Sequence, residues 1–278
     1  MSARCGGSAL LETEPPRGIS RMQAGTIEYE FGIPIPGVIL PEVQWVRTAL
    51  KRLPERGPLE WSAIFGRTAP LVLDLGCGNG RYTLLSALAR PDLNHCAIDV
   101  LPLVIRYATR RANQRGLSNV RFAVKDAETF LSVYVSEASV AEVHLYHPQP
   151  YSGASGRQAR RRMVTPSFLA DVHRVLEPWG RFYLQTDNPE YWGYMTEVLP
   201  HFFQFEPREE PWPDAPEGRT RREIVARARG LRIFRGVGQR RQDLTAEQRR
   251  TLAETLPQPR FRLHRSSHDL DHWERLHP

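Results

Sequence analysis

The chain has 278 residues, a net charge of +7 and a pI near 9.6. This length suits one α/β domain with irregular ends better than two small domains, and the longest apolar stretches are far shorter than the roughly 20 residues that cross a bilayer. The basic balance favours a polyanionic partner such as nucleic acid. Because the first residues lack a secretory signal pattern, we expect a cytoplasmic protein without a membrane segment.

Two further counts bear on chemistry. The three cysteines, Cys5, Cys77 and Cys96, are an odd number without a CxxC pair, which argues against a disulfide framework or a zinc cluster. Of the 38 basic residues only Lys51 and Lys125 are lysines, and 36 are arginines. Such a ratio indicates a coding bias, so the choice of arginine at one position says little, whereas clusters of arginines still inform.

The first elements in chain order are irregular. Residues 1–40 mix glycine, proline and short polar runs and are expected to form an arm, because the prolines of segment 32–37 lack the amide donor that a helix needs. From Pro41 the spacing of Val43, Val46 and Leu50 predicts a short amphipathic helix that ends near Pro54.

Strand-length apolar runs then alternate with helical segments. Alternation of this kind predicts a parallel sheet with right-handed crossovers. The expected strands are 71–75, 95–100, 120–124, 140–146 and 181–185, and the expected helices are 83–89, 101–115, 166–176 and 191–199.

The C-terminal third is expected to close the sheet. Residues 202–205 and 223–228 read as two more strands, which would form an antiparallel hairpin at one edge. The predicted fold is therefore α/β and Rossmann-like, with a mostly parallel seven-stranded sheet and an antiparallel edge hairpin. We expect an arm at 1–40, one domain at 41–236 and a basic extension at 237–278, with a helix near 245–255.

The most informative segment joins the first strand to its helix. It places Asp74 at the end of the strand and glycines at Gly76, Gly78 and Gly80 in the turn that follows. Glycine lets the backbone approach a ligand closely and adopt positive φ. An acid ahead of the glycines would repel a pyrophosphate but would attract a cation, and S-adenosylmethionine carries both an ammonium and a sulfonium.

Two more acids close the next two strands. Asp99 stands where related folds bind ribose hydroxyls, and Asp126 is placed to hold an adenine edge through its side chain or nearby amides. Each acid taken alone is equally well read as a helix N-cap. The three together, at the carboxyl ends of adjacent strands, predict an S-adenosylmethionine site.

Several motifs then resemble one family, the bacterial tRNA (guanine-N7)-methyltransferases of the class I methyltransferase fold. Where that family has Phe-Pro-Asp-Pro-Trp and a basic run, this chain has His-Pro-Gln-Pro-Tyr at 147–151, followed by basic residues and Thr-Pro-Ser-Phe-Leu at 165–169. Thr186-Asp187 with Tyr191 resembles the family's Thr-Asp-x-x-x-Tyr loop, and Thr220 with Glu223 resembles its Thr-x-x-Glu element. The resemblance covers roughly residues 70–235.

The resemblance implies roles at matching positions. Asp74, Asp99 and Asp126 fall on cofactor positions, while Asp187, Thr220 and Glu223 fall on guanosine-binding positions. Two positions depart from the pattern: Gln149 stands where the family has an acid, and Gly153 where it usually has a lysine. Gln149 and Asp187 are the residues expected to serve catalysis, and the departures leave a different base or a lost activity open.

Basic residues near the second motif are candidates for RNA contact. Arg157, Arg160, Arg161 and the neighbouring Arg162 are expected to neutralise phosphates, and Tyr151 to stack on a base. Arg219, Arg221, Arg222, Arg227 and Arg229 form a second basic segment. The competing interpretation is a solvated helix face, with Tyr151 in ordinary packing.

Metal chemistry is not expected. His264, His268 and His272 are four residues apart, but no cysteine or glutamate motif accompanies them. The sequence thus predicts a monomeric or homodimeric methyltransferase that acts on N7 of a guanosine in tRNA. The alternatives are a methyltransferase for another base or a small molecule, and a non-catalytic RNA-binding protein that keeps the cofactor pocket.

Overall fold

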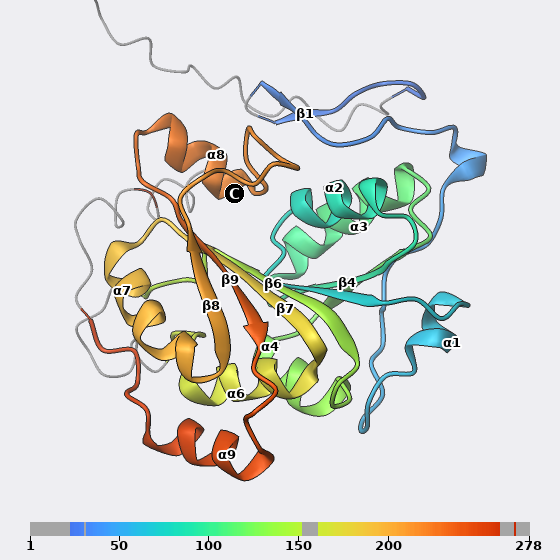
Figure 1. Ribbon diagram of the computed structural model, residues 1–278. Coiled ribbons are helices and arrows are strands. Elements are labelled where there is room, and N and C mark those ends of the chain that lie inside the picture. The colour runs from blue at the N-terminus through green and yellow to red at the C-terminus, as the bar shows by residue number, and fades with distance from the viewer. Residues whose placement is uncertain (1–22, 31, 152–160, 262–269, 271–278) are drawn as a thin grey trace, which may run out of the picture.

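The computed structural model describes residues 23–30, 32–151, 161–261 and 270, and a twisted seven-stranded sheet forms its centre (Figure 1). In spatial order the strands are β5 (Val120–Val124), β4 (Asn94–Asp99), β3 (Leu71–Leu75), β6 (Val140–Tyr146), β7 (Leu176–Thr186), β9 (Phe234–Arg240) and β8 (Phe203–Arg208).

Six of these strands run in the same direction, and β9 runs opposite to them. The pairs β5/β4, β4/β3, β3/β6 and β6/β7 are parallel, whereas β9 pairs antiparallel with both β7 and β8. The predicted mostly parallel, seven-stranded sheet with an antiparallel edge is confirmed. A separate two-stranded sheet, β1 (Tyr29–Glu30) with β2 (Ile33–Pro34), lies in the arm.

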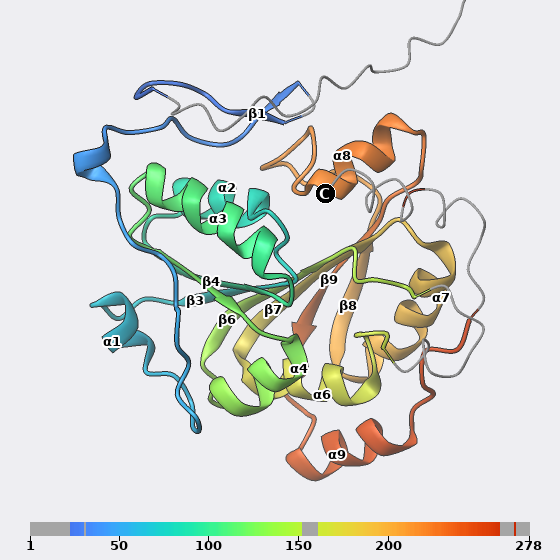
Figure 2. The ribbon, with the colours of Figure 1, turned by 180° about the vertical axis from the view of Figure 1, so that it is seen from behind.

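Helices cover both faces of the sheet. One face packs against α2 (Arg81–Ala89) and α3 (Pro102–Gln114). The other packs against a second layer, seen best from behind in Figure 2, with α9 (Ala246–Thr255) lying on α6. That layer contains α4 (Ala127–Thr129), the π-helical turn η2 (Phe130–Tyr134), α6 (Pro166–Val175), α7 (Pro189–Val198) and the 3-10 turn η3 (Leu199–His201).

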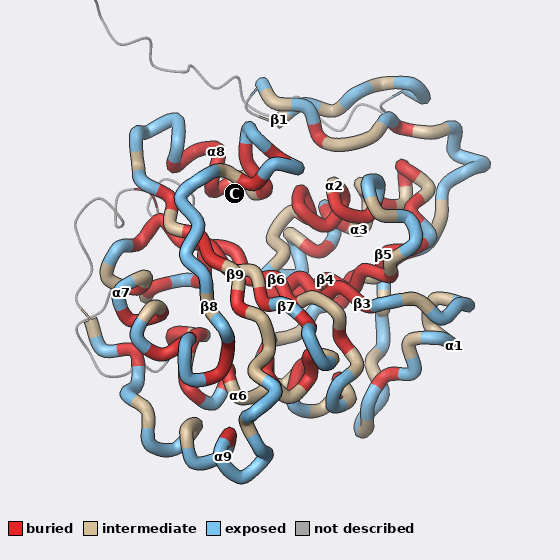
Figure 3. The backbone as a smooth tube through the Cα atoms, in the orientation of Figure 1, coloured by how far each residue is buried: buried red, intermediate tan, exposed pale blue. Residues whose placement is uncertain are grey.

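Burial on both faces explains the apolar strands. Every residue of β3 is buried, including Asp74, and Figure 3 shows the buried positions concentrated along the central strands. A strand covered on both faces reads as a continuous apolar run instead of an alternating one. The sequence therefore located β3, β4, β5 and β6 to within a residue, and the helices between them were also confirmed.

The predicted helix at 41–54 is wrong. Only the 3-10 turn η1 (Glu42–Gln44) forms there, and Val43 is 91% exposed. The segment instead runs along the open edge of β5, where Phe122 donates to the carbonyl of Thr48 and accepts from the amide of Leu50. An unpaired strand edge offers these hydrogen bonds, and they outweigh a weak helical pattern. A short helix that was not predicted, α1 (Trp61–Phe65), follows.

The predicted strand at 223–228 is also wrong, because those residues lie in helix α8 (Arg221–Ala228). Thr220 caps this helix by accepting from the amide of Glu223, whose carboxylate in turn accepts the amide of Arg219. The seventh strand is β9, whose residues continue past the predicted boundary at 236/237. The division into arm, domain and extension remains a prediction.

The predicted helix at 245–255 is confirmed as α9, whose N-terminus carries a capping box made by Thr245 and Gln248. Across the described part of the chain, no helix combines the length and apolar character that a membrane span needs.

Gly80 is required by packing as well as by conformation. Its φ is +79°, and an added Cβ would lie 2.7 Å from the Cβ of Ala108 in α3.

We expect Gly80→Ala to lower the free energy of unfolding by about 1–3 kcal/mol. Urea titration checks this. The matched control is Gly193→Ala in α7, where nothing lies within 4 Å of the new Cβ and φ is helical; it is expected to stabilise by about 0.5–1 kcal/mol. A Gly80 variant as stable as the wild type contradicts the argument.

Candidate S-adenosylmethionine and RNA site

The glycine turn links β3 to α2 and is fastened to the next strand. The amides of Gly76 and Cys77 donate to the carbonyl of Ile98 at 2.8 and 2.9 Å. Gly76 and Gly78 have φ of +74° and +53°, and a Cβ built on either meets nothing within 4 Å. The turn therefore presents bare backbone to open space, which is the arrangement that lets a ligand approach closely.

Asp74 lies beneath this turn. Its side chain is 3% exposed and accepts a hydrogen bond from the hydroxyl of Thr83 at 2.6 Å. Burial raises the pKa of Asp74 to about 7; the Thr83 hydroxyl opposes this, and the nearby Asp99 adds to it. A buried carboxylate with a raised pKa lacks full compensation for its charge, so it favours a cationic ligand.

Asp99 borders the other side of the same turn. Its carboxylate accepts the amide of Gly78 at 3.0 Å and the amide of Leu101 at 2.9 Å. Burial raises the pKa of Asp99, although these two hydrogen bonds act against the rise. An ionised carboxylate has about four acceptor positions, so Asp99 retains capacity for hydroxyl groups. Asp74 and Asp99 thus flank one turn, as the sequence predicted.

Asp126 follows β5 and behaves as a helix N-cap. One carboxylate oxygen accepts the amide of Thr129 at 2.8 Å, and the side chain is 49% exposed. Its pKa is lowered, because the hydrogen bonds from Thr129 and the charge of Lys125 outweigh the effect of burial. The second carboxylate oxygen lies 4.0 Å from Lys125 Nζ. The capping role and a ligand contact are compatible, since a carboxylate has two oxygens.

The two acids that the family resemblance assigns to guanosine are already paired. Asp187, just after β7, receives two hydrogen bonds of 2.9 Å from the Arg222 guanidinium and lies 2.8 Å from His147 Nδ1. Its pKa is held well below the ordinary range, since His147 and Arg222 outweigh the effect of burial. His147, Asp187 and Arg222 belong to separate sequence motifs, and the fold brings them together in one buried cluster.

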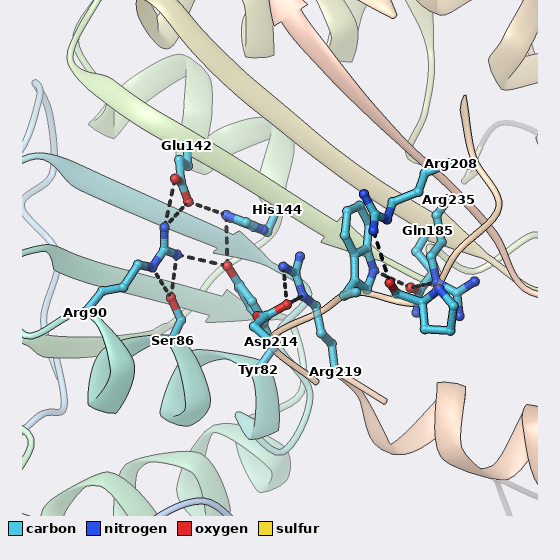
Figure 4. Close-up of polar contacts among 12 residues, drawn as sticks. Tyr82, Ser86, Arg90, Glu142, His144, Gln185, Arg208, Asp214, Arg219 and Arg235 are labelled. Atoms are coloured by element: carbon cyan, nitrogen blue, oxygen red, sulfur yellow. Dashed lines mark hydrogen bonds and ion pairs between the residues drawn. The ribbon is translucent and has the colours of Figure 1, made fainter. Parts of the chain in front are cut away.

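Glu223 lies in the same cluster and is fully buried. It is 2.6 Å from the guanidinium of Arg235 and accepts the amides of Arg219 at 2.8 Å and of the Gln185 side chain at 3.0 Å. The pKa of Glu223 is lowered because these partners, led by Arg235, exceed the effect of burial. Arg235 also donates to the side-chain oxygen of Gln185 at 3.2 Å (Figure 4). Thr220 stays at its edge as the cap of α8.

Sequence reasoning missed the residues that hold these acids. Gln185 bridges His147, Glu223 and the indole N–H of Trp212. Arg219 lies 4.2 Å over the Trp212 ring and is paired with Asp214 at 2.7 Å (Figure 4). The sequence predicts RNA contact for the basic segment 219–229, but Arg219 and Arg222 are buried. The Thr-x-x-Glu pattern at 220–223 was the available signal that this segment begins a helix.

A second buried polar chain ties α2 to β6 (Figure 4). His144 lies 3.0 Å from both the Tyr82 hydroxyl and Glu142, and Arg90 donates two hydrogen bonds to Glu142. Burial lowers the pKa of His144 to about 4, so this ring is neutral at physiological pH. These contacts run from Tyr82 at the start of α2 to Arg90 at its end and fasten the helix to β6.

The loop at 147–151 carries local strain and a basic support. His147 and Tyr151 have φ of 51° and 43°, which is costly for residues other than glycine and is common at functional sites. Gln149 is exposed, and the Arg161 guanidinium lies 4.9 Å over the Tyr151 ring. Arg162 is buried and donates to the carbonyls of Pro150 and Pro259, both at 2.6 Å, so it holds the loop instead of contacting phosphate. Gly153, Arg157 and Arg160 lie outside the described residues.

The described ranges contain no cluster of three or more metal-ligating side chains. Cys77 and Cys96 carry free thiols, while Cys5 and the histidines at 264, 268 and 272 lie outside the described residues.

Comparison with known proteins identifies relatives along most of the chain. A family model described as "Putative methyltransferase" matches residues 68–235. The tRNA (guanine-N(7)-)-methyltransferases of Alcanivorax borkumensis and Chloroflexus aggregans are each 33% identical to this chain over 69% of its length. The matched region covers 79% of the Alcanivorax protein and 87% of the Chloroflexus protein. The 16S rRNA methyltransferase KamB has a TM-score of 0.52 and 18% identity, over 70% of this chain and 98% of its own; that likeness shows the fold alone.

The ionisation of Asp74 predicts a pH-dependent stability. Its folded pKa is raised from 3.8 to about 7, so between these values the folded state binds more protons than the unfolded state and stability falls as pH rises. Asp74→Asn removes this cost and still accepts from Thr83. We expect the variant's melting temperature, relative to wild type, to rise between about pH 5 and pH 8.

The control is Asp126→Asn, which keeps a capping side chain but replaces an acid whose pKa is lowered. Its ionised form stabilises the fold, so this variant should not gain stability toward pH 8. Thermal melts of both ligand-free variants decide the matter, and parallel behaviour of the two would refute the account of Asp74.

Proposed function

This chain belongs to the tRNA (guanine-N(7)-)-methyltransferase family, and we propose that it transfers a methyl group from S-adenosylmethionine to N7 of a guanosine in tRNA. Besides family membership, one observation carries the proposal. The carboxylate of Asp74 is buried, with a raised pKa, below a glycine turn whose backbone is bare. The protein is accordingly an S-adenosylmethionine-dependent enzyme.

The residues present suit this cofactor. Asp74 favours a positive ligand, Asp99 has acceptor positions left for ribose hydroxyls, and we assign the adenine edge to the half-exposed Asp126. Gly76, Gly78 and Gly80 keep side chains away from the turn. When bound, S-adenosylmethionine supplies an electrophilic methyl group on a sulfonium.

The base needs positioning more than activation. N7 of guanine has an in-plane lone pair, so no proton has to be removed first, and near-attack placement is worth about 7–11 kcal/mol. We assign guanosine recognition to Asp187, Thr220 and Glu223. Because Asp187 and Glu223 are buried and already paired with arginines, their contribution is to hold the wall of the pocket rigid and prearranged.

Gln149 is assigned to the position nearest the developing charge on the base. It is exposed on the strained loop, and its amide oxygen is an acceptor without a full charge. Hydrogen bonds to charged partners are about twice as strong, so this enzyme should be slower than one with an acid there. The same residue favours the second candidate, a methyltransferase for another base.

For the RNA we assign stacking to Tyr151 with Arg161, and phosphate contact to Arg157, Arg160 and Arg161. We further propose that the protein acts in the cytoplasm as a monomer or homodimer. The arm at 1–40 and the extension at 237–278 would flank the catalytic domain at 41–236.

Methyl transfer tests the function directly. Wild-type protein with labelled S-adenosylmethionine and unmodified tRNA should yield 7-methylguanosine, and Gln149→Asp should raise kcat about tenfold because it restores a charged acceptor.

Asp187→Asn should lower kcat at unchanged cofactor affinity. Asparagine keeps the size of the aspartate side chain and one acceptor oxygen toward Arg222. Label in another nucleoside supports the second candidate, and cofactor binding without transfer supports a non-catalytic protein.

Cofactor binding should depend on pH. A cation binds the ionised form of Asp74, and with a free-state pKa of about 7 that form is lost below neutrality. Calorimetry should show S-adenosylmethionine affinity falling about tenfold from pH 8 to pH 6. Asp74→Asn should bind weakly with little pH dependence. An affinity that is constant over this range in the wild type speaks against the assignment of Asp74.

A further inference from the structure

We propose that a basic groove between residues 49–53 and α3 binds backbone phosphates of the tRNA substrate, an inference that rests on the proposed function. The groove has a volume of about 630 Å³. Its walls are the segment that runs along the edge of β5 and the outer side of α3, and its apolar floor includes Ile105 and Phe122.

The charge of the groove is one-sided. Four cationic side chains line it, Lys51, Arg106, Arg110 and Lys125, and no acid is among the lining residues. Lys51 and Arg106 are exposed, and no ion pair is recorded for either within the described residues. Cations without nearby acids attract a polyanion, and each neutralised phosphate releases counterions into solution.

Both lysines of the chain line this one groove. The other 36 basic residues are arginines, so two lysines at one location are an uneven distribution. At position 125 the choice has a physical reason. Lys125 Nζ is 4.0 Å from Asp126, whereas an arginine there would pair with that carboxylate through two hydrogen bonds and withdraw it from the cofactor.

The groove begins beside the cofactor site. Lys125 directly precedes Asp126, and Pro102, which lines the groove, starts α3 three residues after Asp99. Both points lie at the carboxyl edge of the sheet, and from there the groove follows the outer edge of β5. A tRNA that places one base near the glycine turn would extend along this edge, so the groove is suited to phosphates flanking the target nucleotide.

The experiment measures binding of an unmodified tRNA transcript to the full chain between about 50 and 200 mM KCl. The test variant is Lys51→Gln with Arg106→Gln, since both side chains are exposed and lie away from the cofactor acids. We expect its log Kd against log salt to have a slope smaller by about two, with weaker binding of every tRNA sequence.

The matched control is Arg181→Gln with Arg250→Gln. It removes the same charge from exposed positions in the middle of β7 and on α9. This control should keep the wild-type slope, and both variants should bind S-adenosylmethionine with wild-type affinity.

If the salt slope of the test variant equals that of the control variant, the groove proposal is overturned. In that case continued methylation of tRNA by the wild type leaves the proposed function standing. A wild type that neither binds nor methylates tRNA overturns both.

Discussion

The organisation of this molecule depends on a carboxylate that is buried without an adequate countercharge. Asp74 lies at the end of the central strand β3, with one hydroxyl as partner and another acid nearby. Such a group costs stability when it is ionised in the free protein, and either a proton or a cationic ligand would relieve that cost. The parallel sheet, the glycine turn and the helix contact at Gly80 all keep that carboxylate in place.

The substrate side solves the same problem in the opposite way. Asp187 and Glu223 are neutralised within the protein by Arg222 and Arg235. One half of the site is thus prepared to gain a charge from its ligand, and the other is prearranged and electrically balanced. This division suits a cationic methyl donor next to a neutral base, because rigid dipoles need no reorganisation when charge moves onto the base.

The wrong strand assignment at 223–228 and the missed strand β9 have physical causes. Residues 223–228 include Ile224 and Val225, which favour strands, but the Thr220 cap fixed a helix. β9 escaped notice because Gly236 and Gly238 weaken a strand on their own; they are needed because the rings of Phe205 and Phe203 occupy the space above them. At α8 a local cap outweighed the side-chain preference, and at β9 a contact between residues distant in the sequence outweighed the local pattern.

The sequence by itself determined the parallel core, the glycine turn and the three acids at the strand ends, because strand direction places consecutive carboxyl ends on one edge. It also placed Asp187 and Glu223 in one site through family resemblance. Only the tertiary structure decided what those acids contact: His147, Gln185 and Arg235 come from separate strands and loops. Ion pairing depends on distances across the fold, which local spacing does not encode.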